Sequence, residues 1–115
     1  MFGTHTQSGY HGSLPGIRQK TLVWGEKTLM TEFILERGSV LPLHSHPHEQ
    51  TGYLVEGHLT LTVGEEAREI FPGDSWSIPG DVEHSARVHQ DSKAIEIFSP
   101  VRMEYLPLEK QSDLL

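Results

Sequence analysis

The sequence predicts a single all-β domain, a sandwich or barrel of about nine short strands. Residues 58–63 alternate cleanly, with Leu59, Leu61 and Val63 on one face and polar side chains on the other. Glycine and proline mark turns at intervals of about 8–12 residues, and the chain holds 11 glycines and 7 prolines. No window carries a convincing helical periodicity, so these features favour an all-β fold over a helical bundle.

The expected strands are short, and most are bounded by turn-forming residues. In chain order they cover residues 20–24, 28–36, 40–43, 50–56, 58–63, 66–71, 75–78, 82–88 and 93–98. The first two contain β-branched and aromatic residues, and Pro42 in the third indicates an edge or a bend. Gly57 ends the fourth strand, and Gly64-Glu65 is a two-residue hairpin turn after the fifth. Turns at 72–74 and 79–81 separate the next three, and 93–98 completes the set.

The chain is long enough for one hydrophobic core and too short for two, with 115 residues and a mass of 12.9 kDa. Residues 1–19 are expected to form an N-terminal arm that lies on the body. Residues 20–106 form the barrel, and residues 107–115 form a polar C-terminal tail.

Composition excludes several classes of partner. The chain has 9 basic and 16 acidic residues, a net charge of −7, which argues against nucleic acid and anionic membranes. It has no run of about 18 apolar residues for a membrane span and no secretory signal, so a cytoplasmic protein is expected. It also has no cysteine, which removes disulfides and thiolate metal sites.

Histidine is the most informative residue type, because three of the eight histidines lie within residues 44–48. Alternate side chains of an extended segment share a face, so His44 and His46 can point the same way. Two imidazoles at this spacing form a chelating pair for a divalent cation. The alternative is the solvated polar end of a strand.

The surrounding spacing resembles the two motifs of the cupin superfamily. Gly38, His44, His46 and Gly57 match the first motif, Gly-x5-His-x-His-x(3–4)-Glu-x6-Gly. Gly73, Pro79 and His84 match the second motif, Gly-x5-Pro-x-Gly-x2-His-x3-Asn. The resemblance covers about residues 20–100 and implies an all-β, single-domain cupin jelly-roll barrel that holds a metal ion.

Three positions depart from these motifs. Gln50 stands in place of the metal-binding Glu, Asp81 in place of Gly, and Val88 in place of Asn. The resemblance then implies a neutral ligand set of His44, His46, Gln50 and His84. Glu49 could supply a carboxylate instead, although strand parity points it to the opposite face.

A neutral ligand set leaves the full positive charge on the metal, which favours a Lewis acid over oxygen-activating iron. Imidazole and amide ligands accept nickel, zinc, iron, manganese or copper, so one divalent transition metal ion per chain is expected without its identity.

Within the cupins, the sequence resembles the pectin-degradation, KdgF-like group. The stretch His-Pro-His-Glu-Gln at 46–50 and the segment from Glu96 through Phe98 to Arg102 carry this resemblance, with Glu96 where the group has Asp. It implies ring opening and ketonisation of 4,5-unsaturated uronates. Glu96 would then be the catalytic acid–base, Arg102 would bind the uronate carboxylate, and Phe98 would pack against the sugar ring.

Each of these roles has a structural alternative. Glu96 could be an exposed acid, Arg102 could pair with Glu104 or with a partner subunit, and Phe98 could be a core residue. The expected partner is a small acidic sugar, and family resemblance together with an open sheet edge favours a homodimer. Two other functions remain open: a non-catalytic sugar- or acid-binding cupin, and a different metal-dependent enzyme such as a dioxygenase or another isomerase.

Overall fold

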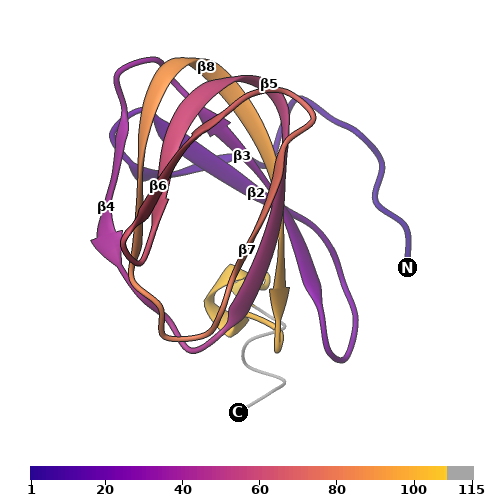
Figure 1. Cartoon of the computed structure of the whole chain (residues 1–115). Coiled ribbons are helices and arrows are strands. Elements are labelled where there is room, and N and C mark those ends of the chain that lie inside the picture. The colour runs from indigo at the N-terminus through magenta and orange to yellow at the C-terminus, as the bar shows by residue number, and fades with distance from the viewer. Residues whose placement is uncertain (109–115) are drawn as a thin grey trace.

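A computed structural model describes residues 1–108, in which eight strands form one continuous antiparallel sheet (Figure 1). The strands are β1 (His11–Leu14), β2 (Ile17–Trp24), β3 (Leu29–Leu35), β4 (Val40–His44), β5 (Glu49–Val63), β6 (Glu66–Ile70), β7 (Ser75–Ile78) and β8 (His84–Ser99). A short 3-10 turn, η1 (Met103–Tyr105), follows β8. The expected all-β fold is confirmed, and the predicted tail at 107–115 lies for the most part outside the described residues.

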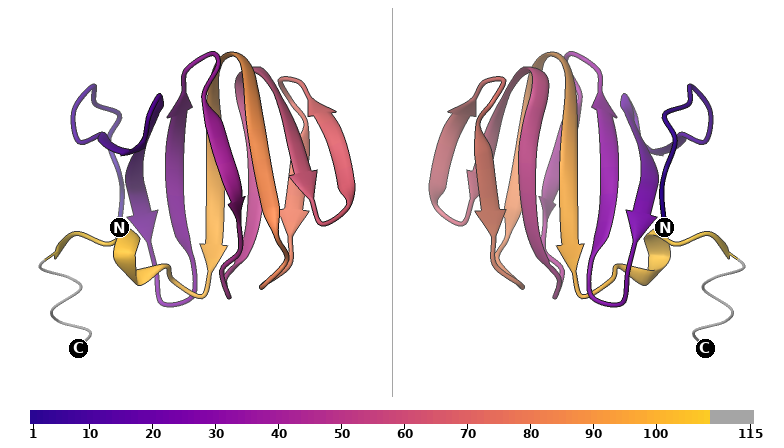
Figure 2. Two further views of the ribbon diagram at one scale, coloured as in Figure 1. Left: turned by 90° about the vertical axis from the view of Figure 1, so that its left-hand side faces the viewer. Right: turned by 90° about the vertical axis from the view of Figure 1, so that its right-hand side faces the viewer.

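Two long strands, β5 and β8, organise the sheet. They pair along almost their whole length, from Glu49 opposite Ser99 to Val63 opposite His84. The other edge of β8 binds β3 and β4, whereas the other edge of β5 binds β6 and β7. The sheet therefore curls around an interior, with β1 and β2 at one side of the molecule and β6 at the other (Figure 2).

The predicted break at Gly57 is wrong, because β5 continues through it. Gly57 has a φ of +105°, a conformation that side chains other than glycine rarely adopt, and the pairing register shifts on both sides of it. A Cβ at this position would lie 2.1 Å from the Ser92 hydroxyl. The glycine thus bends the strand without ending it, as in a β-bulge. The two strands predicted at 82–88 and 93–98 are likewise one strand, β8.

The strand expected at 20–24 begins earlier. Residues 11–14 form β1, which pairs with β2 from Ile17 onward across the Pro15-Gly16 turn. Gly16 has a φ of +75°, which suits the tight reversal, and Ile17 is buried. The sequence before residue 17 lacks a periodic pattern, since the side chains of β1 are exposed along its length.

The core fills the inside of the curled sheet. Its main cluster contains Leu54, Leu59, Leu61, Ile70, Ala86, Val88 and Ala94. Leu35 on β3, Leu41 on β4 and Trp76 on β7 pack against this cluster. The alternation predicted for 58–63 is therefore confirmed, since Leu59 and Leu61 face inward. Among the described residues, no helix is long and apolar enough to cross a membrane.

The bend at Gly57 generates a stability prediction. Gly57→Ala should lower the free energy of unfolding by about 2 kcal/mol or more, because it combines a positive φ with a close approach to backbone. Gly25→Ala is the matched control, since a Cβ there meets nothing within 4 Å, and it should change stability by less than about 1 kcal/mol. Urea unfolding measures both variants, and equal stabilities would contradict the account of the bend.

Candidate metal centre

Three histidines converge at one end of the barrel. His44 ends β4 and His84 begins β8, and these two residues are register partners. His46 lies in the loop that leads into β5. The ring centroids of His44 and His84 are 4.2 Å apart, and His46 lies 5.0 Å from His84 and 5.7 Å from His44. One ligand nitrogen from each ring lies within 4.8 Å of the others, so the cluster can hold a metal ion.

Backbone carbonyls determine which nitrogen of each ring is available. The Nδ1 atoms lie 2.8 Å from the Pro42 oxygen for His44, 3.0 Å from the His48 oxygen for His46, and 2.9 Å from the Val82 oxygen for His84. A carbonyl only accepts hydrogen bonds, so each Nδ1 carries the hydrogen and each Nε2 presents a lone pair. His84 Nε2 is buried and has no hydrogen-bond partner among the described residues. Three such lone pairs directed at one region fit a cation.

The electrostatic environment keeps two of these rings neutral. Burial is the main cause that lowers the pKa of His46, and the positive charge of Arg102 adds to it. Burial also lowers the pKa of His84, again with a contribution from Arg102. Because imidazole binds a metal only in its neutral form, both shifts favour ligation.

Gln50 adds an oxygen to the cluster, as strand parity predicted. Its side chain is buried and points inward, whereas Glu49 is exposed. Gln50 donates its Nε2 hydrogen to Glu96 across 2.6 Å, which directs its Oε1 toward His46 Nε2 at 3.0 Å. Because His46 carries its hydrogen on Nδ1, His46 Nε2 and Gln50 Oε1 are both acceptors. A cation bound by both atoms satisfies this arrangement.

Glu96 lies inside the barrel, beside the cluster. It is 8% exposed, and its second oxygen accepts a hydrogen bond from Trp76 Nε1 at 3.1 Å. Burial raises the pKa of Glu96 to about 8, although the hydrogen bonds from Gln50 and Trp76 act in the opposite direction. The alternative of an exposed acid is thereby excluded, and the group has a pKa suited to both giving and taking a proton near neutrality.

Trp76 is a site residue that the sequence pattern does not reveal. In the sheet, Trp76 on β7, Gly52 on β5 and Glu96 on β8 are consecutive register partners. A Cβ on Gly52 would lie 2.2 Å from the Trp76 ring, so only glycine lets the indole cross β5 and reach Glu96. The sequence offers one signal, Gly52 at an inward-facing position of β5. It indicates space for the Trp76 ring only once the strand register is known.

The turn between β7 and β8 holds the histidine loop in place. Asp81, which stands where the cupin motif has glycine, has a φ of +66° and donates its backbone N–H to the His46 carbonyl at 2.8 Å. A Cβ on Gly80 would lie 2.5 Å from the Pro47 oxygen. This close approach of two backbones fixes the position of His46.

Arg102 and Phe98 lie next to the cluster but differ in accessibility. The Arg102 side chain is 16% exposed; its guanidinium carbon lies 4.2 Å from the Tyr105 ring centre, and its Nε donates to Glu104 at 2.5 Å. Phe98 is only 1% exposed and packs edge-on against His46. The expected contact between Phe98 and a sugar ring therefore has no free surface in this structure, and Phe98 instead lies under Arg102 and His46.

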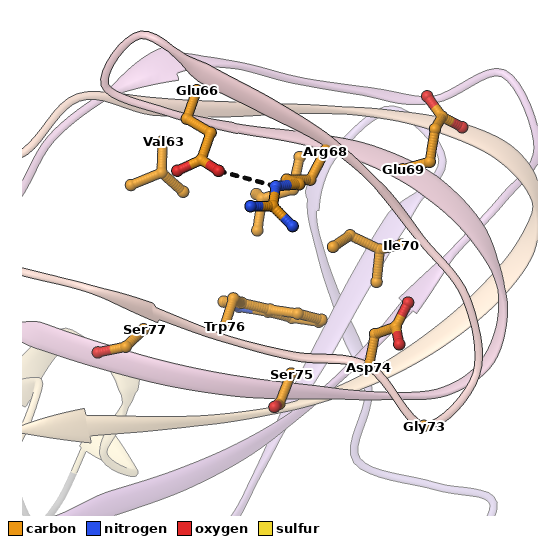
Figure 3. Close-up of a pocket in the computed structure, with 11 residues that line it drawn as sticks. Val63, Glu66, Arg68, Glu69, Ile70, Gly73, Asp74, Ser75, Trp76 and Ser77 are labelled. Carbon is orange, nitrogen blue, oxygen red and sulfur yellow. Dashed lines mark hydrogen bonds and ion pairs between the residues drawn. The ribbon is translucent and has the colours of Figure 1, made fainter.

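Two hollows meet at Trp76. A small cavity of about 60 Å³ inside the barrel is lined by Gln50, His84 and Glu96 together with core residues. A groove of about 510 Å³ lies along β6 and β7, where Arg68 pairs with Glu66 above the Trp76 ring (Figure 3). The inner cavity borders His84, Gln50 and Glu96, so the candidate centre lies beside it.

Comparisons with known proteins identify the family and the fold. The family model of the cupin domain matches residues 31–99. KdgF from Halomonas sp. is 30% identical, with a TM-score of 0.87 over 92% of this chain and 100% of that chain. An RmlC-like cupin from Shewanella frigidimarina is 25% identical, with a TM-score of 0.86 over 91% of this chain and 95% of that chain.

A curated relative, H2HPP isomerase of Bacillus subtilis, is 34% identical over 83 residues. The match covers 71% of this chain but only 35% of that protein, so this chain spans about a third of its length. Oxalate decarboxylase of Bacillus subtilis is 19% identical with a TM-score of 0.69, which shows a shared fold alone.

The ligand assignment predicts the effect of removing two rings. The double substitution His44→Ala and His46→Ala should abolish the metal that this cluster retains after gel filtration, because it removes two of the three converging Nε2 atoms. The fold should persist, since neither ring belongs to the main core cluster. His5→Ala with His11→Ala is the control and should retain metal. Metal analysis at the wild-type level in the first variant would contradict the assignment.

The raised pKa of Glu96 predicts a pH dependence of stability in the metal-free protein. The folded state keeps the Glu96 proton up to pH 8 or so, whereas the unfolded chain releases it near its ordinary pKa of 4.5. Glu96 therefore stabilises the fold fully at low pH, and this contribution is lost as pH rises from about 4.5 to about 8.

Glu96→Gln removes this titration and leaves the histidines in place. With a chelator present, the variant should lose less stability than the wild type between pH 5 and pH 8 in urea unfolding. Identical pH profiles would show that the buried carboxyl group does not titrate as its surroundings indicate.

Proposed function

The chain belongs to the cupin family, and we propose that it is a metal-dependent isomerase that opens and ketonises 4,5-unsaturated uronates. The observation that carries the proposal is the direct link between the histidine cluster and a buried carboxyl group, from His46 through Gln50 to Glu96. The resemblance to the KdgF-like group and the 30% identity to KdgF of Halomonas sp. support the same reaction.

The reaction needs a group that accepts and returns a proton. Opening the ring breaks the bond between C1 and the ring oxygen and removes the proton of the C1 hydroxyl. Ring opening therefore leaves an enolate at C5, and this enolate becomes the 5-keto product when C4 takes up the proton that the C1 hydroxyl lost, so the composition does not change. Glu96 performs both transfers, since its pKa of about 8 leaves both protonation states accessible near neutral pH.

His44, His46, His84 and Gln50 would hold the divalent cation. A cation bound by these neutral ligands supplies a Lewis acid that polarises a substrate oxygen. Gln50 also orients Glu96 through its amide hydrogen, and Trp76 holds the other carboxyl oxygen. The proton-transfer group therefore has a fixed position relative to the ligand set.

Arg102 binds the carboxylate of the uronate. Its planar guanidinium forms paired hydrogen bonds to carboxylates. Tyr105 and the buried Phe98 pack against the guanidinium, and Glu104 holds its Nε. These contacts already restrict the Arg102 side chain, so substrate binding costs it less conformational entropy. Phe98 acts in this account by supporting Arg102 and His46.

A second candidate is a different isomerisation on the same site. The 34% identity to a protein named H2HPP isomerase favours it, because that name describes another reaction that rearranges a molecule without changing its composition. Glu96 and the ligand set would keep the same roles, and the residues around the cavity would select another substrate.

The direct test follows the absorbance of a 4,5-unsaturated uronate in the presence of metal-loaded protein, with chelated protein as the control. Faster loss of absorbance with the loaded protein only would support ketonisation. If none of nickel, zinc, iron, manganese or copper accelerates the loss, the uronate proposal is rejected and the second isomerisation becomes the leading candidate.

Replacing the proton-transfer group should lower the rate with the metal still bound. Glu96→Gln should reduce ketonisation by about 100-fold or more, the usual contribution of a positioned acid–base group. Glu32→Gln is the matched control, because Glu32 is equally buried at 8% but bonds to Tyr10. Its rate should match the wild type. An unchanged rate in Glu96→Gln would remove Glu96 from the mechanism.

A further inference from the structure

A second group of metal-ligating side chains lies on the outer face of the sheet, away from the barrel interior. It comprises His58 on β5, Glu69 on β6 and His89 on β8. One ligand atom from each residue lies within 4.8 Å of the others. The cluster shares no residue with the one formed by His44, His46 and His84, and the proposed function does not use it.

Strand alternation places this outer cluster outside the barrel. Leu59 and Leu61 face the core, so Thr60 between them and His58 just before Leu59 face outward. Thr60 is the register partner of Glu69, which places these two side chains next to each other on the same face. The strand order β8, β5, β6 then puts the three ligating residues side by side on a paired sheet.

The side chains of the outer cluster are already in contact. His58 Nε2 lies 2.5 Å from one Glu69 oxygen, and the Thr60 hydroxyl donates to the other oxygen at 2.5 Å. His89 Nε2 lies 2.6 Å from the same hydroxyl. Phe71 stacks on the His58 ring with 4.5 Å between centres and an angle of 10°, which restricts the orientation of that ring.

We propose that His58, Glu69 and His89 form a second, solvent-facing binding site for one divalent transition metal cation of the zinc type. Two imidazoles and a carboxylate are a donor set that Zn²⁺ accepts, with bonds of about 2.0–2.2 Å. The cation takes the place of the hydrogen between His58 and Glu69, and the His58 ring keeps its proton on Nδ1. Water occupies the remaining coordination positions.

The chemistry of this face differs from that of the first centre in two respects. Glu69 contributes a negative charge, whereas the four ligands proposed inside the barrel are all neutral. The side chains of His58 and Glu69 are 24% and 53% exposed, so water competes for the ion more strongly than inside the barrel. The outer site should consequently bind metal more weakly and exchange it faster, and the net charge of −7 favours cation binding in general.

Calorimetric titration of Zn²⁺ at pH 7.5 into the His44→Ala/His46→Ala variant tests the proposal. With the inner centre disabled, the variant should still bind about one equivalent of Zn²⁺. Adding His58→Ala and His89→Ala should abolish that equivalent, whereas adding His5→Ala and His11→Ala should leave it intact. Thr60→Val should weaken binding by roughly 10-fold, because the hydroxyl orients Glu69 as an outer-shell partner.

The reciprocal titration keeps the test valid if the inner double variant does not fold. Zn²⁺ binding to the otherwise wild-type chain should fall from two equivalents to one when His58 and His89 are replaced by alanine. The proposal is overturned if the stoichiometry does not change there, or if the remaining equivalent in the inner double variant survives loss of both outer histidines.

Discussion

The pairing of β5 with β8 along almost their whole length is the constraint on which the candidate centre depends. It places Gln50 opposite Phe98 and Gly52 opposite Glu96, so the amide and the carboxyl group that meet inside the barrel come from adjacent inward positions. His84, the first residue of β8, is the register partner of His44 at the end of β4, so these two histidines lie side by side. Because β5 bends at Gly57 without breaking, one pair of strands lines both the core and the site.

The candidate centre combines uncharged side chains with an enclosed environment in which burial, aided by the charge of Arg102, lowers the pKa of two of its histidines. Three backbone carbonyls hold the hydrogens of the three rings on Nδ1, and burial next to Arg102 lowers the pKa of His46 and His84. Burial raises the pKa of Glu96, so one enclosed environment favours lone pairs on the rings and a proton on the carboxyl group. The histidine cluster and the buried carboxyl group are thus joined through Gln50 but differ in protonation.

Sequence patterns predicted the fold, the histidine cluster and the inward direction of Gln50, because those features depend on strand alternation and on motif spacing. They did not predict that β5 continues through Gly57, since glycine in a sequence usually indicates a turn. They also did not predict that the sheet starts at β1, since a strand exposed along its length has no hydrophobic periodicity. Trp76 was missed as a partner of Glu96, because that contact depends on the register across three strands. The burial of Phe98 depends likewise on tertiary packing.

X-ray absorption at the zinc edge tests the central claim most directly, since it reports the ligands that surround the ion. The sample is the His58→Ala/His89→Ala variant loaded with one equivalent of Zn²⁺, which confines the metal to the inner centre. The account predicts three imidazole nitrogens and at least one oxygen at about 2.0–2.2 Å. A spectrum with two imidazoles or fewer would contradict convergence of His44, His46 and His84 on one ion.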